Sequence, residues 1–391
     1  MSAPVADVIV VGLGAMGSGA LWRLARRGVE VLGVEQFAPG HDRGSSHGQS
    51  RIIRTAYSEG GGYVGLAQRA WRLWEELEAE AGETLLERTG GLLLGDADSP
   101  WISGARRSAA AHHLAHELLS AGEIRERFPQ HRLTDPTVGF YERDAGVLRP
   151  ERAVRAAVAV ATAAGAGVVE GQAVREILPD PERPAVRLDD RILVARQLVV
   201  SVGAWLPRLL PDLELPLRVV RRVQTWFEPP SPAEFAPDRF PIFIRSDDGG
   251  GDGERSWYGC PTMDGTTVKA ALHEWPGLDE PVDPAAGPRP PDETDAKRVA
   301  ALVEEGLPGL GPGPSRMQAC MYTLTPDLDF IVGRRRDLPG ITVLGGFSGH
   351  GFKFAPLMGE VAAQLALTGA TDQPIDLFDP HRFDARAAER S

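Results

Sequence analysis

Short apolar runs alternate with one helical period at the start of the chain. Asp7 to Val11 is an apolar run that ends at Gly12, and Ala15 to Arg27 follows with helix-forming residues on a helical period before Gly28. Val29 to Glu35 is then a second run with the length and composition of a buried strand. This order of strand, glycine turn, helix and strand predicts a βαβ unit with a right-handed crossover and a parallel sheet.

The pattern changes from long periodic segments to short alternating ones in the middle of the chain. Between Val219 and His273 the apolar positions alternate over short stretches, which predicts an antiparallel sheet. Pro281 to Pro291 is rich in Pro, Ala and Gly and predicts a surface loop. The other predicted helices are Tyr63–Ala81, Glu151–Ala164, Thr294–Glu305 and Ala355–Leu367, and the other predicted strands lie near Gly167–Gly171 and over Leu193–Val202, Val223–Phe227, Ile242–Arg245, Thr267–Leu272 and Ile341–Leu344.

Composition narrows the class of protein. The 391 residues are 42% hydrophobic and 25% charged, a balance typical of globular proteins that carry a large core. A net charge of -12 without a run of Lys or Arg argues against nucleic acid and anionic membranes as partners. Two cysteines are too few for a disulfide framework, and we find no signal segment in Met1 to Ala6 and no membrane span in Ala156 to Val169. We therefore expect a cytoplasmic location.

The first turn carries a dinucleotide fingerprint. Gly12, Gly14 and Gly17 have the G-x-G-x-x-G spacing, which permits a tight turn, close approach to a pyrophosphate and packing of helix on strand. The turn follows a predicted strand and opens a helix, and Glu35 lies 18 residues beyond Gly17, where an acid can bind ribose hydroxyls. This acid argues against the 2′-phosphate of NADP, while NAD and FAD stay open.

Three further segments carry a resemblance to a known family. They are Gly44-Ser45-Ser46-His47-Gly48-Gln49-Ser50-Arg51-Ile52-Ile53-Arg54, then Cys320-Met321-Tyr322-Thr323, and then Gly346-Phe347-Ser348-Gly349-His350-Gly351-Phe352-Lys353-Phe354. Tyr258, Lys269 and His273 match as well, at spacings of 11 and 15 residues. From Asp7 to the last helix the chain resembles the monomeric sarcosine oxidase and N-methyltryptophan oxidase family of FAD-dependent amine oxidases. It departs from that family at Ser46, where sarcosine oxidases often have a second histidine.

The resemblance implies an α/β fold with two domains. One is a discontinuous, Rossmann-like FAD-binding domain formed by residues 1–85, 146–218 and 318–391. The other is an inserted, mainly antiparallel substrate domain formed by residues 86–145 and 219–317. The discontinuity requires that the strand at Ile341–Leu344 rejoin the N-terminal sheet.

The resemblance also implies how FAD is held. Cys320 takes the position of the residue that bonds the flavin's 8α-methyl group as a thioether, a reaction that an electropositive, partly enclosed site favours. The other cysteine, Cys260, is interpreted as a small buried hydrophobe. The implied cofactor-binding residues are Gly12, Gly14, Gly17, Glu35, Ser45, His47, Arg51, Cys320, Gly346, Phe347, Gly349 and Lys353.

Substrate and oxygen have their own implied residues. Arg54 and Lys353 bind a substrate carboxylate, with Tyr322 lining the same pocket, although a loop arginine can equally pair with a surface acid. Tyr258 and His273 bind or shuttle protons near the amine, although a lone histidine is more often structural. The implied role of Lys269 is oxygen activation, and Arg51 supplies positive charge at the flavin.

One histidine cluster needs a separate interpretation. His112, His113 and His116 have the spacing of zinc ligands on a helix, but no carboxylate motif lies nearby. We interpret them as a solvated helical face and expect no metal.

These residues together predict an FAD-dependent oxidase of secondary amines, most of all N-methyl or cyclic α-amino acids, with O2 as acceptor and hydrogen peroxide as product. A flavin dehydrogenase with another electron acceptor and a flavin-binding subunit without turnover are the alternatives. The resemblance favours a monomer. The side chain of the substrate is left open by the sequence.

Overall fold

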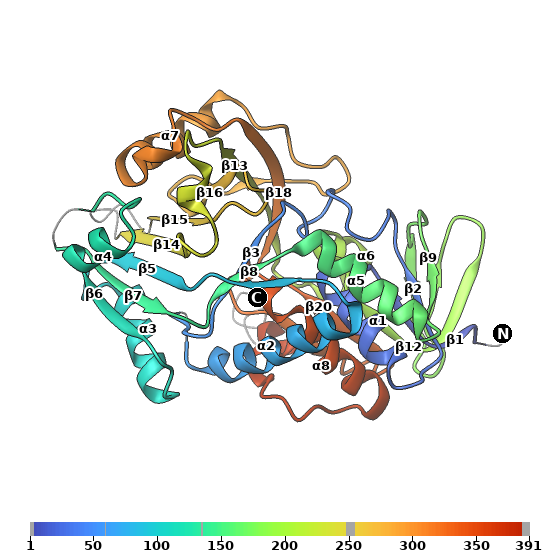
Figure 1. The fold of residues 1–391 in the computed structure, drawn as a ribbon. Coiled ribbons are helices and arrows are strands. Elements are labelled where there is room, and N and C mark those ends of the chain that lie inside the picture. Colours follow the sequence, from blue (N-terminus) through green and yellow to red (C-terminus); the bar gives the residue numbers. More distant parts are fainter. Residues whose placement is uncertain (1–3, 59, 134–135, 248–254, 385–391) are drawn as a thin grey trace.

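Two large β-sheets organise this computed structural model, which describes residues 4–58, 60–133, 136–247 and 255–384 (Figure 1). Residues 1–3, at the start of the segment searched for a signal, lie outside these ranges. Figure 1 places two short strands, β3 and β8, between the large sheets. They belong to a small antiparallel sheet of β3 (Arg51–Ile53), β8 (Gly146–Leu148) and β4 (Leu86–Arg88).

The first sheet has a parallel centre. Its middle strand is β1 (Ala6–Val11), which lies between β2 (Val31–Val34) and β12 (Ile192–Val200) and is parallel to both. The C-terminal strand β20 (Ile341–Gly345) pairs in parallel with β12, so the end of the chain rejoins the N-terminal sheet as the discontinuous fold requires. The remaining strands are β9 (Gly167–Val169), β10 (Glu176–Leu178), β11 (Ala185–Arg187) and β19 (Ile331–Arg334).

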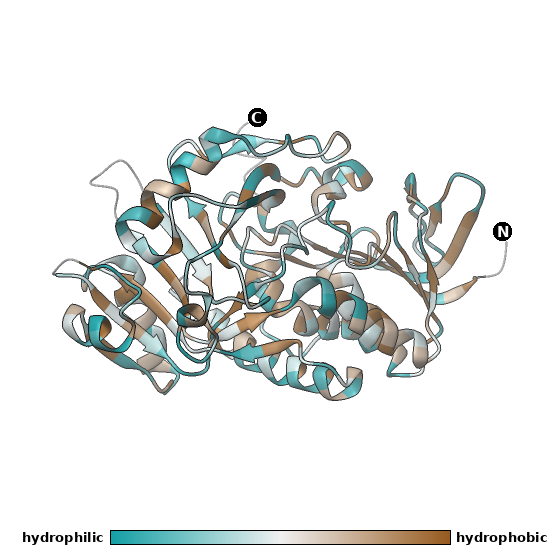
Figure 2. Ribbon diagram, turned by 45° about the horizontal axis from the view of Figure 1, so that its top comes forward, coloured by the Kyte–Doolittle hydropathy of each residue, from teal (hydrophilic) through white to brown (hydrophobic). Residues whose placement is uncertain are grey.

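Side chains that point alternately to the two faces of β1 explain how this sheet is buried on both faces. Val8 and Val10 pack into one apolar cluster with the helices, while Ile9 and Val11 pack into a second cluster on the opposite face. Hydrophobic colour accordingly runs along the strands of the first sheet in Figure 2. The helices of the first cluster are α1 (Ala15–Ala25), α2 (Gly62–Ala81), α5 (Pro150–Ala163) and α8 (Ala355–Thr368).

Two glycines let α1 and α8 approach each other closely. A Cβ on Gly19 would lie 2.7 Å from the Ala355 carbonyl oxygen, and a Cβ on Gly359 would overlap the backbone of Gly19. Only backbone fits at this crossing. The C-terminal helix is therefore fixed against the helix that follows the glycine turn, and the loop before α8 is brought to the same end of the sheet.

The second sheet is antiparallel except for one pair, β14 with β5. The strand β18 (Arg316–Leu324) pairs with β13 along nearly its whole length, with Cys320 opposite Arg222. The predicted domain boundary at residue 318 therefore cuts a strand that is hydrogen-bonded to the second sheet, and the other domain boundaries stay predictions. The remaining strands are β5 (Gly91–Gly95), β6 (Glu117–Ser120), β7 (Val138–Glu142), β13 (Arg218–Phe227), β14 (Ile242–Asp247), β15 (Arg255–Cys260), β16 (Val268–Glu274) and β17 (Glu280–Pro281).

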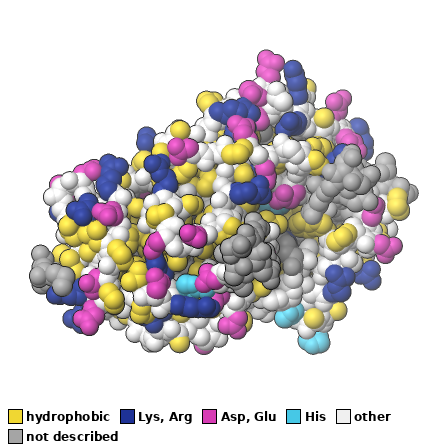
Figure 3. Space-filling model, turned by 180° about the vertical axis from the view of Figure 1, so that it is seen from behind, with side chains coloured by type: hydrophobic (Ala, Val, Ile, Leu, Met, Phe, Trp, Pro, Cys, Tyr) yellow, Lys and Arg dark blue, Asp and Glu magenta, His cyan; other side chains and the backbone are white. Residues whose placement is uncertain are grey.

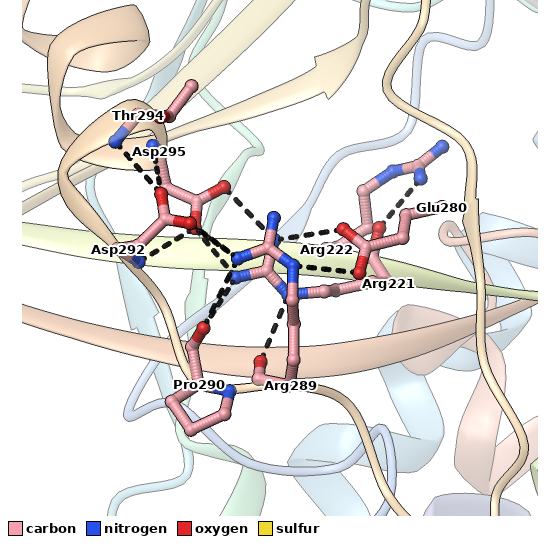
Figure 4. A network of polar contacts seen from close by, with 8 residues as sticks. All are labelled: Arg221, Arg222, Glu280, Arg289, Pro290, Asp292, Thr294 and Asp295. Carbon is pink, nitrogen blue, oxygen red and sulfur yellow. Dashed lines mark hydrogen bonds and ion pairs between the residues drawn. The ribbon is translucent and has the colours of Figure 1, made fainter.

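A polar network ties the loop after β17 to this sheet (Figure 4). Arg221 on β13 forms an ion pair of 2.6 Å with Asp295 in the first turn of α7 (Glu293–Gly306) and donates to the carbonyl of Pro290 at 3.2 Å. Asp292 caps the same helix by accepting from Thr294 N at 2.8 Å. The loop predicted at Pro281–Pro291 is thus fixed to the strand that carries Arg222.

The surface carries charges of both signs. Lys and Arg side chains are interspersed with Asp and Glu over the face seen in Figure 3. In the part of the chain that the structure describes, no helix combines the length and the apolar character needed to cross a membrane.

One prediction about local structure is wrong. Helix α3 (Pro100–Ala111) ends before His112, which is its C-cap, and His113 adopts a φ of 54°. His116 lies beyond the helix and stacks on Phe140 at a centroid distance of 4.9 Å. The three histidines therefore do not share a helical face, because the chain leaves the helix at its first member. Two shorter helices complete the fold, α4 (Ala121–Arg127) and α6 (Leu206–Leu209).

Candidate functional site

The three glycines of the fingerprint have three different surroundings. Gly12 adopts a φ of +84°, and a Cβ there would lie 2.6 Å from the Ser201 carbonyl oxygen. A Cβ on Gly17 would overlap the carbonyl of Gly12. A Cβ on Gly14 would meet only Ser46 Oγ, at 3.6 Å. Gly12 and Gly17 are thus required by the protein's own packing, whereas Gly14 faces open space where a ligand can approach the backbone.

Glu35 is held just after β2 and is buried, with 3% of its surface exposed. Its carboxylate accepts from Leu13 N at 2.7 Å and from Phe37 N at 3.0 Å. These bonds connect the acid to the glycine turn, and they leave lone pairs on both oxygens for further donors such as ribose hydroxyls. The predicted position of this acid is confirmed, while its role toward a ligand stays a prediction.

A cavity of about 630 Å³ opens beside the turn. It lies within the size range of cofactor sites. Gly12, Gly14 and Glu35 line one end of this large cavity, and Gly346, Phe347 and Gly349 line another part. Segments from both ends of the sequence therefore build one cavity, because β20 lies in the same sheet as β1. Ser45, Arg51 and Tyr322 are the other predicted residues that line it.

The segment after β2 lies between the helix and the second sheet. Ser46 Oγ accepts from Ala15 N at the start of α1 at 3.1 Å, and Ser45 Oγ donates to Met321 O at 2.6 Å. His47 is almost fully buried, and neither ring nitrogen has a hydrogen-bond partner among the described residues. Burial, and then the charge of Arg51, lower the pKa of His47 to about 4. His47 is therefore a neutral ring at physiological pH, and it lies in the protein interior between the helix and the second sheet.

A second cavity of about 80 Å³ adjoins the first. Arg51, Tyr322, Gly349 and Phe352 line both cavities. Arg51 is fixed at this junction because its guanidinium donates to Ser50 O at 2.7 Å and to Ser45 O at 2.8 Å. A ligand in the small cavity would therefore contact the end of a ligand in the large one.

Three buried cations line the small cavity, Arg54, Lys353 and Arg222, and the last of these forms an ion pair of 2.7 Å with Asp279. Lys353 Nζ donates to Tyr57 Oη at 2.9 Å and to His350 O at 2.8 Å. The Arg54 guanidinium donates to Ala56 O and lies 4.5 Å from the centre of the Tyr57 ring. Tyr57 thus contacts both Arg54 and Lys353, and its hydroxyl also lies 3.0 Å from His350 Nδ1. Buried positive charge of this kind matches an anionic group of a ligand.

Three aromatic residues form another wall of the small cavity. Tyr322 Oη lies 3.5 Å from His273 Nδ1, and the Tyr258 and His273 rings are 6.4 Å apart. Burial, and then the Cys320 thiol, raise the pKa of Tyr322 to about 12, and burial raises the pKa of Tyr258 well above its ordinary value. Both phenols are therefore neutral hydrogen-bonding groups at physiological pH.

The two cysteines have different surroundings. Cys320 lines the small cavity, while Cys260 is fully buried in an apolar cluster with Ala145 and Ile242, as its interpretation as a small hydrophobe predicts. Burial raises the pKa of both thiols. At Cys320 the charges of Arg51, Lys269 and Arg222 oppose this effect.

Lys269 lies behind the junction and lines neither cavity. Its side chain is 2% exposed, and its Nζ donates to three oxygens, of Gly48, Ser50 and Gln224. Burial, and then the charge of Arg51, lower its pKa to about 7. A pKa near 7 makes the charge of Lys269 sensitive to pH, and Lys269 shares the acceptors Ser50 O and Gln224 Oε1 with Arg51 at the junction.

The structure thus brings most predicted site residues together. Gly17 and His47, like Lys269, line neither cavity. Of the other predicted cofactor-binding residues, Cys320 and Lys353 line only the small one. Sequence reasoning missed Tyr57, Gln224 and Arg222, which no motif marks. The missed Glu142 is fully buried, and it fixes the loop beside Arg54 by accepting from Thr55 Oγ1 at 3.0 Å and from Ala56 N at 2.9 Å.

The large cavity fits an FAD-sized dinucleotide on three observations. Gly14 leaves space for a pyrophosphate at the start of α1, and Glu35 lies in the cavity wall where a ribose would be. The cavity also continues to Tyr322, which lies two residues beyond Cys320. The far end of such a ligand would therefore reach the predicted attachment region.

Comparisons with known proteins agree with this geometry. The family model described as FAD dependent oxidoreductase matches residues 7–365. The monomeric sarcosine oxidase of Streptomyces avermitilis is 40% identical over 98% of this chain and 100% of its own length. The N-methyl-L-tryptophan oxidase of Salmonella heidelberg is 34% identical over 96% of this chain and 99% of its own length. Among solved structures, NikD, an unusual amino acid oxidase essential for nikkomycin biosynthesis, superposes with a TM-score of 0.83 at 26% identity, over 96% of this chain and 97% of that one.

Proposed function

The chain belongs to the FAD dependent oxidoreductase family, and from this premise we propose that it oxidises N-methyl or cyclic α-amino acids with O2. The products are an imine, which water hydrolyses, and hydrogen peroxide. One observation carries the proposal. A small cavity with three buried cations shares four lining residues with a cavity of cofactor size, so an amino acid bound there would contact the reactive end of FAD.

Arg54 and Lys353 are proposed to bind the substrate carboxylate. A bidentate guanidinium and a point-charge ammonium, both buried, orient an anionic group strongly. Their position against Tyr57 then fixes the direction in which the rest of the substrate extends. The amine end is directed toward the wall formed by Tyr258, His273 and Tyr322.

The amine must be neutral before it is oxidised, and His273 is proposed to take its proton. A neutral imidazole ring nitrogen can accept a proton, and Tyr322 Oη, 3.5 Å from Nδ1, orients the ring. Tyr258 and Tyr322 stay protonated and serve as hydrogen-bond donors to the substrate. When bound, FAD would be the oxidant: it would take a hydride equivalent from the carbon next to nitrogen and pass the electrons to O2.

Lys269 and Arg51 are proposed to supply positive charge for the oxygen reaction. Negative charge develops as O2 is reduced, and a fixed cation in a dry site stabilises it. Arg51 lines both cavities, and Lys269 lies directly behind it, with its charge sensitive to pH near neutrality.

Cys320 is proposed to hold FAD through a thioether to the 8α-methyl carbon. Closing this C–S bond would release the thiol proton and a hydride equivalent of the methyl group, and O2 would take up both as hydrogen peroxide. Burial raises the pKa of this thiol, and the charges of Arg51, Lys269 and Arg222 oppose that rise. A monomer, as the name of the Streptomyces avermitilis relative states for that protein, is part of the proposal. The cytoplasmic location stays a prediction from the sequence.

The experiment is a peroxide assay with the yellow holoprotein. N-methyl and cyclic α-amino acids should release peroxide in air, and the matching amines without a carboxylate should react at least about a hundredfold more slowly. Bleaching without air but no peroxide after air is admitted would indicate a dehydrogenase. A flavin that no amine bleaches would indicate a subunit without turnover.

The covalent link has a separate test. Acid precipitation should leave the yellow colour on wild-type and Cys260→Ser polypeptide but release it from Cys320→Ser. Colour released equally from all three would contradict the link and leave the proposed oxidation intact.

A further inference from the structure

Gln224 lies at the centre of the polar contacts behind the cavity junction. It is 2% exposed and stands on β13, and it also lines the small cavity. Its Oε1 accepts from Lys269 Nζ at 2.5 Å and from Arg51 Nη1 at 3.3 Å. Its Nε2 donates to His47 O at 3.4 Å. One amide therefore contacts three of the residues that the resemblance places around the flavin.

The backbone is shaped to admit this side chain. Gly48 adopts a φ of +99°, and a Cβ at Gly48 would overlap the amide of Gln224. A residue other than glycine would be strained at this φ and would displace the amide. The position of Gln224 is therefore determined by the loop that also carries the carbonyls of Gly48 and Ser50.

The hydrogen bonds of Lys269 use all of its donors. An ammonium has three N–H groups, and Lys269 Nζ has three acceptors, Gly48 O at 3.2 Å, Ser50 O at 3.1 Å and Gln224 Oε1 at 2.5 Å. Two of these acceptors are backbone carbonyls that cannot rotate away. Gln224 is the one side chain of the three, and its contact is the shortest.

We propose that Gln224 is a positioning residue, whose amide holds the Lys269 ammonium beside Arg51 and whose rotation frees a Lys269 N–H for the oxygen reaction. The inference rests on the proposed function, because it concerns the step in which O2 is reduced. The reaction of substrate with oxidised flavin depends on the other wall of the small cavity, so Gln224 acts on one half of the turnover.

The charge of Lys269 gives this role a pH signature. Its pKa is lowered to about 7, by burial first and by Arg51 second. The oxygen step should be fast where Lys269 is protonated and slow above that pKa. The other groups that face Lys269 are Glu151 and the thiols of Cys260 and Cys320, which oppose the lowering, together with the rings of Trp226 and Tyr258 and the buried His47.

The two informative variants are Gln224→Leu and Gln224→Glu, assayed as holoenzymes. Leucine removes the acceptor, so the pKa of Lys269 falls. Glutamate adds a negative charge, so that pKa rises. Gln318→Leu is the matched control, because Gln318 lies opposite Gln224 on β18 and its amide donates to Asp42 instead.

Each variant is first bleached by an N-methyl amino acid without air and then mixed with O2 across about pH 5 to pH 10. In Gln224→Leu the reoxidation rate should fall about tenfold at about pH 8, because the pH midpoint of reoxidation shifts down. The bleaching rate should change less than about threefold. Gln224→Glu should shift the midpoint up, and Gln318→Leu should match the wild type.

Two outcomes would overturn the inference: unchanged reoxidation midpoints in both variants, or bleaching and reoxidation slowed to the same extent. If Gln224→Leu does not retain FAD, the midpoint of Gln224→Glu decides alone. A wild type that no amine bleaches would instead overturn the proposed function. If the wild type is bleached and reoxidised and the reoxidation midpoints of both variants equal that of the wild type, only the role of Gln224 is overturned.

Discussion

The two adjoining cavities are built in different ways. The large one is formed at its glycine turn by backbone, where Gly12 and Gly17 pack against neighbouring main chain and Gly14 leaves space. The small one is formed by buried side chains that hold one another, such as Tyr57 with Arg54 and Lys353. Backbone geometry suits a cofactor that many proteins share, whereas side chains can change with the substrate.

This difference also separates what each cavity tolerates. A substitution at Gly12 or Gly17 acts on the packing of the backbone, whereas one at Gly14 acts on cofactor retention. A substitution in the small cavity removes one contact from a set and leaves the fold in place. The predictions below test this contrast, from the largest expected effect to the smallest.

The largest effect is expected at Gly17. In Gly17→Ala the new methyl group overlaps the Gly12 carbonyl, so the free energy of unfolding should fall by about 3 kcal/mol or more. In Gly14→Ala the methyl group meets only Ser46 Oγ at 3.6 Å, so stability without FAD should change by less than about 1 kcal/mol while FAD is lost. Thermal unfolding with and without FAD checks both. Equal loss of stability in the two variants would contradict the contrast.

Removing a cation from the small cavity should lower catalytic efficiency without changing the fold. Arg54→Leu and Lys353→Met should each lower kcat/KM for an N-methyl amino acid by about a hundredfold or more. FAD content should be unchanged. The matching amine without a carboxylate is the control substrate, and its kcat/KM should change little. A similar loss for both substrates would assign these residues to another role.

The sequence predicted the backbone-built cavity more completely than the side-chain-built one. The glycine spacing and Glu35 are local signals, each set by one turn and one strand end, and the structure places them at one cavity. Lys269 could be identified by resemblance, but its partner Gln224 could not, because their contact depends on how β13 pairs with β16 and packs on the loop at Gly48.

The same reason explains the missed residues and the histidine error. Tyr57 and Glu142 have no motif, since their contacts join residues 296 and 87 positions apart. The spacing of His112, His113 and His116 would place them on one helical face only if helix α3 continued past them. The helix ends at Ala111. A C-cap without glycine gave no sequence signal for that end.

A smaller effect is expected at Tyr57. Tyr57→Phe removes the hydroxyl that accepts from Lys353 and contacts His350, so KM for an amino acid should rise about fivefold to tenfold while kcat changes little. Tyr63→Phe is the matched control. Its ring stacks on Tyr57, but its hydroxyl donates to Asp329 at 2.5 Å. Equal changes in KM for both variants would show that the Tyr57 hydroxyl does not position Lys353.

The last prediction concerns stability and not activity: Glu142 should make the free energy of unfolding depend on pH. Burial raises its pKa from 4.5 to about 7, against the hydrogen bond from Ala56 N and the charge of Arg54. Between these values the folded state binds the proton and the unfolded state does not, so this group lowers stability as pH rises from 4.5 to about 7. The difference in unfolding free energy between Glu142→Gln and wild type should change across that window. A constant difference would contradict the raised pKa.

The most direct measurement is a crystal structure of the FAD-loaded protein with a carboxylic acid that has the shape of the substrate but cannot be oxidised. We expect the carboxylate within hydrogen-bond distance of Arg54 and Lys353, the other end of the acid against the flavin ring, and the dinucleotide along Gly14 and Glu35. A carboxylate bound away from both cations, or a flavin ring outside the junction lined by Arg51 and Tyr322, would contradict the account.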